Sequence, residues 1–158
     1  PQGLKWGETT LALAEAARNI KNVMGNKDLF QKVKELALPI GRYVLFGSAP
    51  LGIRNLRECA DIDIVVTQDI WDKYKARPDW QLDKTRHGNS YLRNGRLELL
   101  KDWKPGIWDI EKLIKEAEII DGLPFVRLEY VVEWKRLNAR EKDLKDIEII
   151  ENFLRQQR

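Results

Sequence analysis

Apolar residues recur at helical spacing in the first part of the chain and form two stripes. The stripes are Leu13, Ala17, Ile20 and Met24, followed by Leu29, Val33 and Leu36. Thr9 and Thr10 can cap the first stripe, and Gly25-Asn26 is expected to break it, because both residue types disfavour a helix interior. The second stripe ends before Pro39, which lacks the backbone N–H that a helix needs. The pattern predicts two helices within residues 1–39.

The next segments have patterns typical of strands. Tyr43–Phe46 is a short β-rich run that ends at Gly47-Ser48, and residues 61–66 alternate acidic with aliphatic side chains. Successive side chains of a strand point to opposite faces, so Asp61 and Asp63 are expected on one face with Val65. The opposite face would carry Ile62, Ile64 and Val66. The second strand therefore presents two carboxylates together.

Two dipeptides, Asn94-Gly95 and Asp121-Gly122, are typical of two-residue hairpin turns. The first lies between the runs 90–93 and 96–100, and both of its residues are expected at positive φ. The second lies between 119–120 and 123–125. We further expect a short helix at 70–74, an extended segment at 80–83, and an amphipathic helix that carries Ile110, Leu113, Ile114 and Ala117.

The carboxyl end predicts two more helices, joined by Asn138-Ala139-Arg140. Their apolar positions are Leu128, Val131 and Val132, and then Leu144, Ile147, Ile150 and Leu154. Helices bracket a strand-rich middle, which indicates an α+β fold with a small mixed β-sheet flanked by helices. We expect one domain over residues 1–158, with N-terminal helices at 1–39, a strand-rich core at 40–126 and a C-terminal helical pair at 127–158.

Composition argues against several classes of protein and site. The 158 residues are 43% hydrophobic and 34% charged, as in folded chains, and the net charge of +3 is small for a protein that coats nucleic acid. Cys59 and His87 are single, which argues against an internal disulfide, zinc and His-cluster sites, and a Ser-His-Asp triad. There is neither a run of about 20 apolar residues nor a signal-peptide pattern, so we expect a cytoplasmic protein without membrane contact.

The candidate chemistry lies around the first two strands. A Gly47-Ser48 turn that enters a short helix offers free backbone N–H groups and a hydroxyl to a phosphate. Asp61 and Asp63 lie ~6–7 Å apart along one strand and can converge on Mg²⁺, which prefers oxygen ligands. Glu98, on the face of its strand opposite Leu97 and Leu99, is the candidate third acid and general base.

These motifs occur in the order found in a known family. The chain resembles the nucleotidyltransferase superfamily typified by DNA polymerase beta, and most closely its small branch related to abortive-infection toxin nucleotidyltransferases. The resemblance covers roughly residues 40–155 and rests on three patterns. These are Gly47-Ser48, Asp61-Ile62-Asp63, and Lys135 with the run Arg140-Glu141-Lys142-Asp143-Leu144-Lys145-Asp146.

The resemblance implies transfer of a nucleoside monophosphate from a nucleoside triphosphate to an acceptor hydroxyl, with Mg²⁺ or Mn²⁺. It implies that Gly47 and Ser48 hold the donor phosphates and that Asp61, Asp63 and Glu98 bind the metal. The nucleotide-binding residues that it implies are Lys135, Arg140, Lys142 and Asp143. The acceptor stays open between RNA and protein, and a protein partner, as in a toxin–antitoxin pair, is compatible with it.

Two departures from the family pattern keep a second hypothesis open. The third acid is Glu98, where many relatives have Asp, and the segment Ala49–Gly52 differs from the minimal enzymes. The alternative is a catalytically silent relative that binds nucleotide, RNA or a partner protein, and a third hypothesis is a purely structural interaction domain. Ordinary explanations also exist for single residues, because Lys135 can cover core surface with its stem and Asp143 can complement a helix dipole.

Overall fold

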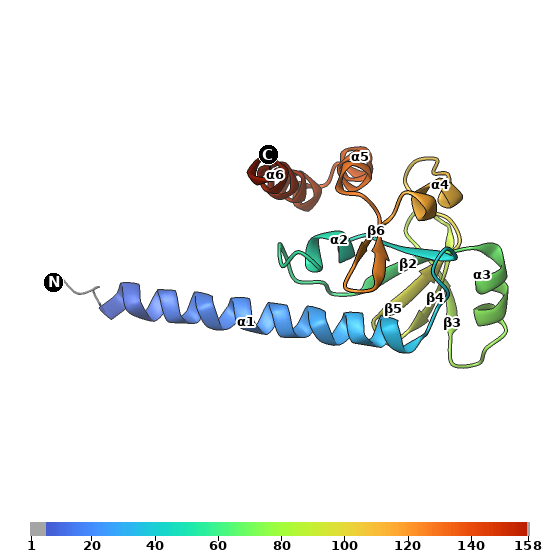
Figure 1. The fold of residues 1–158 in the computed structure, drawn as a ribbon, viewed down its shortest axis with the longest axis horizontal. Coiled ribbons are helices and arrows are strands. Elements are labelled where there is room, and N and C mark those ends of the chain that lie inside the picture. The colour runs from blue at the N-terminus through green and yellow to red at the C-terminus, as the bar shows by residue number, and fades with distance from the viewer. Residues whose placement is uncertain (1–5, 158) are drawn as a thin grey trace.

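The computed structural model describes residues 6–157, which form one seven-stranded sheet between two layers of helices (Figure 1). The strand order is β3-β4-β5-β2-β1-β7-β6. The pairs β2/β5 and β1/β7 are parallel and the other neighbours are antiparallel, so the α+β class with a mixed sheet is confirmed. The elements are α1 (Trp6–Glu35), β1 (Tyr43–Phe46), α2 (Ala49–Gly52), β2 (Ile62–Val66), α3 (Gln68–Lys75), β3 (Gln81–Lys84), β4 (Ser90–Asn94), β5 (Leu97–Leu100), α4 (Ile110–Lys115), β6 (Glu118–Ile120), β7 (Leu123–Phe125), α5 (Leu128–Asn138) and α6 (Glu141–Gln156).

Helix α1 corrects the prediction of two separate N-terminal helices, because it continues through Gly25-Asn26. Asn26 is buried, and its amide makes hydrogen bonds to distant residues, which helix propensities do not take into account. Its Nδ2 donates to the carbonyls of Arg57 (2.9 Å) and Gly52 (3.4 Å), and its Oδ1 accepts from the backbone N–H of Cys59 (2.8 Å). These tertiary hydrogen bonds stabilise asparagine inside the helix and attach α1 to the loop before β2.

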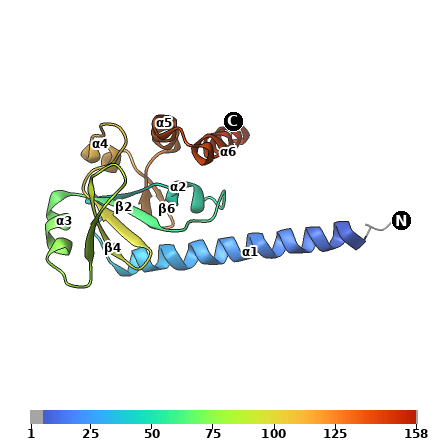
Figure 2. The ribbon, with the colours of Figure 1, turned by 180° about the vertical axis from the view of Figure 1, so that it is seen from behind.

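The first half of α1 projects beyond the sheet, as both views of the ribbon show (Figures 1 and 2). The helix begins at Trp6, so Thr9 and Thr10 lie inside α1 and not at its start as expected. The first apolar stripe is not buried, because Leu13 is 67% and Ile20 61% exposed; the side chain of Met24 lies outside the described part. No helix within residues 6–157 is both long and apolar enough to cross a membrane.

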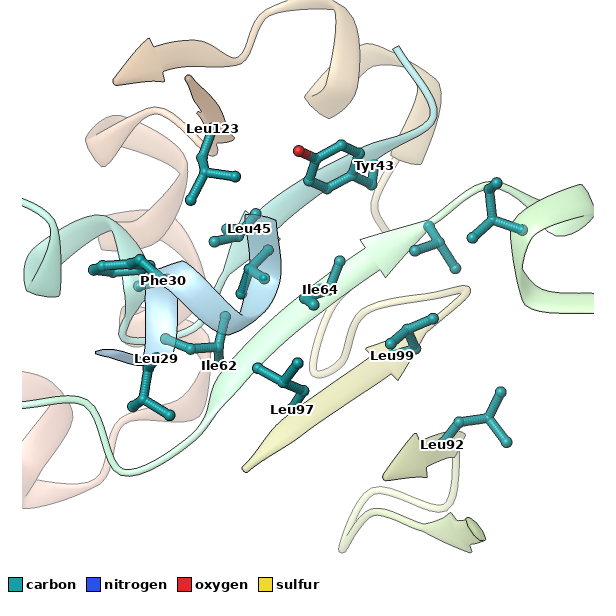
Figure 3. Close-up of a cluster of buried hydrophobic side chains, with 14 of the residues drawn as sticks. Leu29, Phe30, Tyr43, Leu45, Ile62, Ile64, Leu92, Leu97, Leu99 and Leu123 are labelled. Atoms are coloured by element: carbon teal, nitrogen blue, oxygen red, sulfur yellow. The ribbon is translucent and has the colours of Figure 1, made fainter. Parts of the chain in front are cut away.

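One face of the sheet packs against the second half of α1 and against α3. Leu29 and Phe30 of α1 lie over Leu45 of β1 and over Ile62 and Ile64 of β2 (Figure 3). The same cluster continues over β5 and β7 through Leu97, Leu99 and Leu123. The aliphatic face of β2 that the alternating sequence predicts is therefore the face toward α1.

The opposite face packs against α4, α5 and α6. Val65 of β2 lies in this layer, and Phe46 at the end of β1 stacks on Trp103 with a ring-centroid distance of 4.5 Å. Ile147 and Ile150 of α6 are buried here as expected, but Leu144 is 56% exposed and corrects that part of the predicted stripe. Since Asp63 alternates with Ile62 and Ile64, its side chain points into this helical layer.

The two predicted hairpins form, with one change in the first. Asn94 pairs with Leu97, so the loop residues are Gly95 and Arg96, and only Gly95 has a positive φ (59°). Asn94 belongs to the strand, which corrects the expectation that it occupies the turn. In the second hairpin Asp121 (φ 51°) and Gly122 (φ 78°) form the turn as predicted.

Candidate functional site

The turn after β1 brings its backbone against the carboxyl group of Asp63. Gly47 has a φ of 63°, and a Cβ atom at this position would lie 2.2 Å from Asp63 Oδ2. Only glycine combines this φ with so close an approach. Ser48 follows as the first flanking residue of α2, and its hydroxyl makes no capping hydrogen bond with that helix. The expected strand–turn–helix geometry is therefore present, and the Ser48 side chain is not used as a cap.

Strand pairing brings Asp63 and Glu98 together. Asp63 lies opposite Phe46 on the antiparallel strand β1 and opposite Glu98 on the parallel strand β5. Residues paired in register point to the same face of a sheet, so both carboxyl groups enter the layer under α5 and α6. Asp61 precedes β2 by one residue and is half-buried. Three acids, one from β5, one from β2 and one from the residue before β2, thus line the same cavity as the Gly47-Ser48 turn.

Burial and mutual repulsion raise the pKa of both aspartates. For Asp63 the pKa lies well above the usual range, first because burial disfavours the charged form, and then because of a hydrogen bond with the Glu98 carboxyl and the charges of Glu98 and Asp61. Burial, followed by the charge of Glu98, also raises the pKa of Asp61, against the opposing charges of Arg93 and Arg96. Acidic side chains are therefore crowded at this end of β2 and β5, where their charged forms are disfavoured.

Arg93 is the counter-ion on the sheet side of the site. It lies opposite Glu98 on the neighbouring strand β4, and its Nη2 donates to Glu98 Oε1. The guanidinium also lies over the ring of Tyr91, at 5.4 Å from the ring centroid. Glu98 thus has two partners in this structure, the carboxyl group of Asp63 and the guanidinium of Arg93.

The helical side of the site is basic. Lys135 of α5 is only 3% exposed, and its Nζ lies 2.8 Å from Asp146 Oδ2 and 3.4 Å from Asp143 Oδ1. Arg57, in the loop before β2, pairs with the same Asp146. Burial, and then the charges of Arg140, Arg57 and Lys135, lower the pKa of Lys142. Cations from one loop and two helices therefore face the acids of the sheet.

Asp143 positions two of these cations. Its carboxylate is fully buried and accepts from Arg140 Nε (2.8 Å), from Arg140 Nη2 (3.2 Å) and from the Arg140 backbone N–H (3.1 Å). Burial alone would raise the pKa of Asp143, but the hydrogen bonds from Arg140, followed by the charge of Lys135, bring it below its usual value. Asp143 also has an ordinary structural role, because it is part of the capping box at the start of α6.

One cavity of about 190 Å³ collects almost all the residues that the sequence singled out. Its lining includes Gly47, Ser48, Asp61, Asp63, Glu98, Lys135, Arg140 and Lys142. Asp143 does not line this cavity and lies behind Arg140 and Lys135. Residues that are up to 95 positions apart in the chain, Gly47 to Lys142, thus meet at one place.

The acids are not already arranged as a metal centre. Among the residues that the structure describes, no group of three or more His, Cys, Asp or Glu side chains is placed to hold a metal ion. The carboxyl group of Glu98 is engaged by Asp63 and Arg93. Binding of a cation by all three acids therefore requires that these contacts be exchanged for contacts with the cation.

Sequence reasoning missed four residues of the site and its surroundings. Arg57 and Trp134 line the cavity, Arg93 pairs with Glu98, and Asn26 fixes the loop that carries Arg57. Arg57 and Asn26 lie in segments without a recognisable motif. The spacing of Arg93 and Glu98 about a predicted hairpin turn is the one signal that could have indicated their pairing.

Comparisons with known proteins add no relative. No protein-family model matches the chain, and no match was found among curated proteins or among solved structures. The assignment of a function therefore rests on the residues and their geometry.

The replacement Gly47→Ala should lower the free energy of unfolding by more than the positive φ of residue 47 alone explains. A positive φ costs an L-residue about 1–2 kcal/mol, and displacement of the Asp63 carboxyl should add about 1–3 kcal/mol. The matched control is Gly95→Ala, because Gly95 has nearly the same φ of 59° with nothing within 4 Å of an added Cβ. Urea unfolding measures both variants. Equal losses of stability would show that the approach of Gly47 to Asp63 is unimportant.

Replacement Asp63→Asn should stabilise the protein at neutral pH. A raised folded-state pKa adds stability that is fully present below the unfolded-state value, near 4, and is lost as pH rises through the folded-state pKa. Asparagine does not titrate, so the variant does not lose this stability, which for the wild type falls by about 1.4 kcal/mol per pH unit. The melting temperature of the variant should therefore exceed that of the wild type at pH 7–8. The difference should shrink toward pH 4.

The control for this experiment is Asp69→Asn, since Asp69 is exposed and has a lowered pKa, chiefly through a hydrogen bond from Thr67. That variant should show no gain in melting temperature at any pH. A less stable Asp63→Asn protein at pH 8 would contradict the assigned crowding of carboxyl groups.

Proposed function

We propose that the protein is a metal-dependent nucleotidyltransferase, which transfers a nucleoside monophosphate from a nucleoside triphosphate to an acceptor hydroxyl. The observation that carries this proposal is one cavity that is lined by both acids and cations. Its three carboxyl groups come from the sheet, and its cations come from α5, from the start of α6 and from the loop before β2. Phosphoryl transfer needs this combination, because the donor is an anion whose negative charge shifts during the reaction. The proposal also agrees with the resemblance of the sequence motifs to the polymerase-beta-like family.

The donor set fits Mg²⁺ or Mn²⁺. Asp61, Asp63 and Glu98 offer only carboxylate oxygens, which hard divalent cations prefer, and neither histidine nor cysteine is among the residues that line the cavity. Burial, and after it the neighbouring acids Glu98 and Asp61, raise the pKa of Asp63, and a cation between the carboxylates would relieve the repulsion among them. When bound, such ions would neutralise phosphate charge and lower the pKa of an attacking hydroxyl.

The residues of the chain itself would bind and orient the donor. The backbone of the Gly47-Ser48 turn and the free Ser48 hydroxyl border the cavity and can donate to phosphate oxygens. Arg140 and Lys142 reach the same cavity from the start of α6, and Lys135 is held beside them by Asp143 and Asp146. These cations would neutralise the charge that collects on the leaving pyrophosphate.

Glu98 would accept the proton in the transfer step. The acceptor oxygen attacks the α-phosphorus, the bond from this phosphorus to the bridging oxygen of the β-phosphate breaks, and pyrophosphate leaves. The proton of the attacking hydroxyl passes to a Glu98 carboxylate oxygen. Because Arg93 now pairs with this carboxylate, the side chain of Arg93 must withdraw before Glu98 can act as base.

The same ion pair favours one alternative. If Arg93 keeps Glu98 engaged after nucleotide binds, the protein is a silent nucleotide-, RNA- or protein-binding module rather than an enzyme. The two functions differ in one product, since only the enzyme releases pyrophosphate.

Incubation with each α-labelled nucleoside triphosphate and Mg²⁺ or Mn²⁺, in the presence of total RNA and candidate proteins, tests the proposal. The wild type should transfer label, and the double variant Asp61→Asn/Asp63→Asn should lose at least 10²-fold in rate, because the oxygen ligands of the cation are gone. The control Asp69→Asn removes an acid outside the cavity and should keep full activity.

The outcomes separate the two candidates. Nucleotide binding without pyrophosphate release by the wild type favours the silent module. Unchanged transfer by the double variant would rule out the role of the two aspartates.

A further inference from the structure

A second, larger hollow lies beside the cavity of about 190 Å³ described above, which we call the acidic cavity. It has a volume of about 620 Å³ and is lined by Arg57, Glu58, Ala60, Arg96, Lys142, Lys145, Asp146 and Ile149. Arg57, Ala60 and Lys142 line both hollows, so the two are adjacent. We call the larger one the basic groove. It runs from the acids along one side of α6.

The basic groove carries an excess of positive charge. Its cations are Arg57, Arg96, Lys142 and Lys145, against the two acids Glu58 and Asp146. Asp146 is already engaged by Lys135 and Arg57. The pKa of Lys142 is lowered by burial and then by neighbouring cations, which indicates a positive potential at the junction with the cavity.

Two of these cations remain available to a ligand. The guanidinium of Arg96 donates to the backbone carbonyls of Cys59 and Ala60, contacts that fix its position without neutralising its charge. Lys145 pairs at 3.8 Å with Glu141, which is exposed, and a pair of this type contributes little in water. Arg96 and Lys145 come from different segments and border the same hollow.

The size of the two hollows decides which part of the reaction each serves. A volume of about 190 Å³ lies below the ~300–1,000 Å³ typical of pockets for whole small ligands, so the acidic cavity suits phosphate groups and ions. An acceptor must present its hydroxyl to this cavity from outside, and the basic groove is the adjacent hollow that shares three lining residues with it. A duplex cannot enter so small a cavity, whereas the end of a single strand can.

We propose that the basic groove binds the phosphodiester backbone of a single-stranded nucleic acid, whose terminal hydroxyl is the acceptor. This inference rests on the proposed nucleotidyltransferase function and names the class of its acceptor. Lys145 and Arg96 contact backbone phosphates, and Ile149 provides an apolar contact for a sugar or base. The contacts are to the backbone, so binding has little dependence on base sequence.

The test uses the whole protein and a fluorescein-labelled 12-nucleotide oligouridylate, with binding followed by anisotropy in EDTA. Wild type is compared with Arg96→Gln/Lys145→Gln. Each phosphate contact to a single strand changes the slope of log K against log[salt] by about 0.7, so loss of two contacts should flatten the slope by about 1.4 and weaken binding about 25-fold at 0.1 M salt. The control Lys73→Gln/Lys75→Gln removes the same charge from α3, on the opposite face of the sheet, and should bind as the wild type does.

A second variant guards against a local loss of structure. Lys145 is exposed on α6, so Lys145→Glu should fold normally and still weaken oligonucleotide binding, whereas Lys73→Glu should not. Equal weakening by the groove variants and the α3 variants would overturn the proposal in favour of attraction by net charge. Absence of oligouridylate binding by the wild type would overturn it directly.

Two further arms distinguish other anions. A fluorescent ATP analogue with Mg²⁺ should bind wild type and Arg96→Gln/Lys145→Gln equally; selective loss of the analogue instead would assign the groove to the donor triphosphate. A 12-residue polyglutamate should compete poorly with the oligonucleotide, and strong competition would assign the groove to acidic protein. Oligonucleotide binding in EDTA should persist in Asp61→Asn/Asp63→Asn, so a failure of this inference can be told apart from a failure of the catalytic proposal.

Discussion

The carboxyl group of Asp63 lies against a backbone turn on one side and beside a second carboxyl group on the other. This placement is unfavourable by itself, since burial and the neighbouring acids Glu98 and Asp61 all oppose the charged form. The surrounding structure maintains it through three features: Gly47 removes the Cβ that would collide with Asp63, Arg93 neutralises Glu98, and the rigid pairing of β2 with β5 fixes the spacing. Strained and crowded ionisable groups of this kind cluster at functional sites, which is why this place is the candidate site.

The sheet order explains how the acids and the cations come to face each other. The parallel pairing of β2 with β5 places Asp63 beside Glu98, and the turn after β1 closes the same end of the sheet. Helices α5 and α6 then cross the face toward which these acids point. The buried ion pairs among Lys135, Asp143 and Asp146 hold the two helices in this orientation, so the basic layer is positioned before any ligand arrives.

Much of the arrangement can be predicted from sequence where it depends on local periodicity. The alternation of β2 predicts the shared face of Asp61 and Asp63, and the hairpin signal predicts the strand that carries Glu98. The continuous α1 cannot be predicted locally, because Asn26 is stabilised by carbonyls more than 25 residues away. The same holds for Arg57, whose partner Asp146 lies on α6. Long-range hydrogen bonds and ion pairs leave no periodic signal in the chain.

The central claim is that Asp61, Asp63 and Glu98 share divalent cations beside the Gly47 turn. Crystals of the wild-type protein soaked with Mn²⁺ and a non-hydrolysable nucleoside triphosphate test it most directly, by anomalous scattering from manganese. The account predicts manganese between the three carboxylates, the triphosphate against the Gly47-Ser48 turn, and an Arg93 side chain that has left Glu98. Manganese and nucleotide bound elsewhere, with the Arg93–Glu98 pair intact, would contradict it.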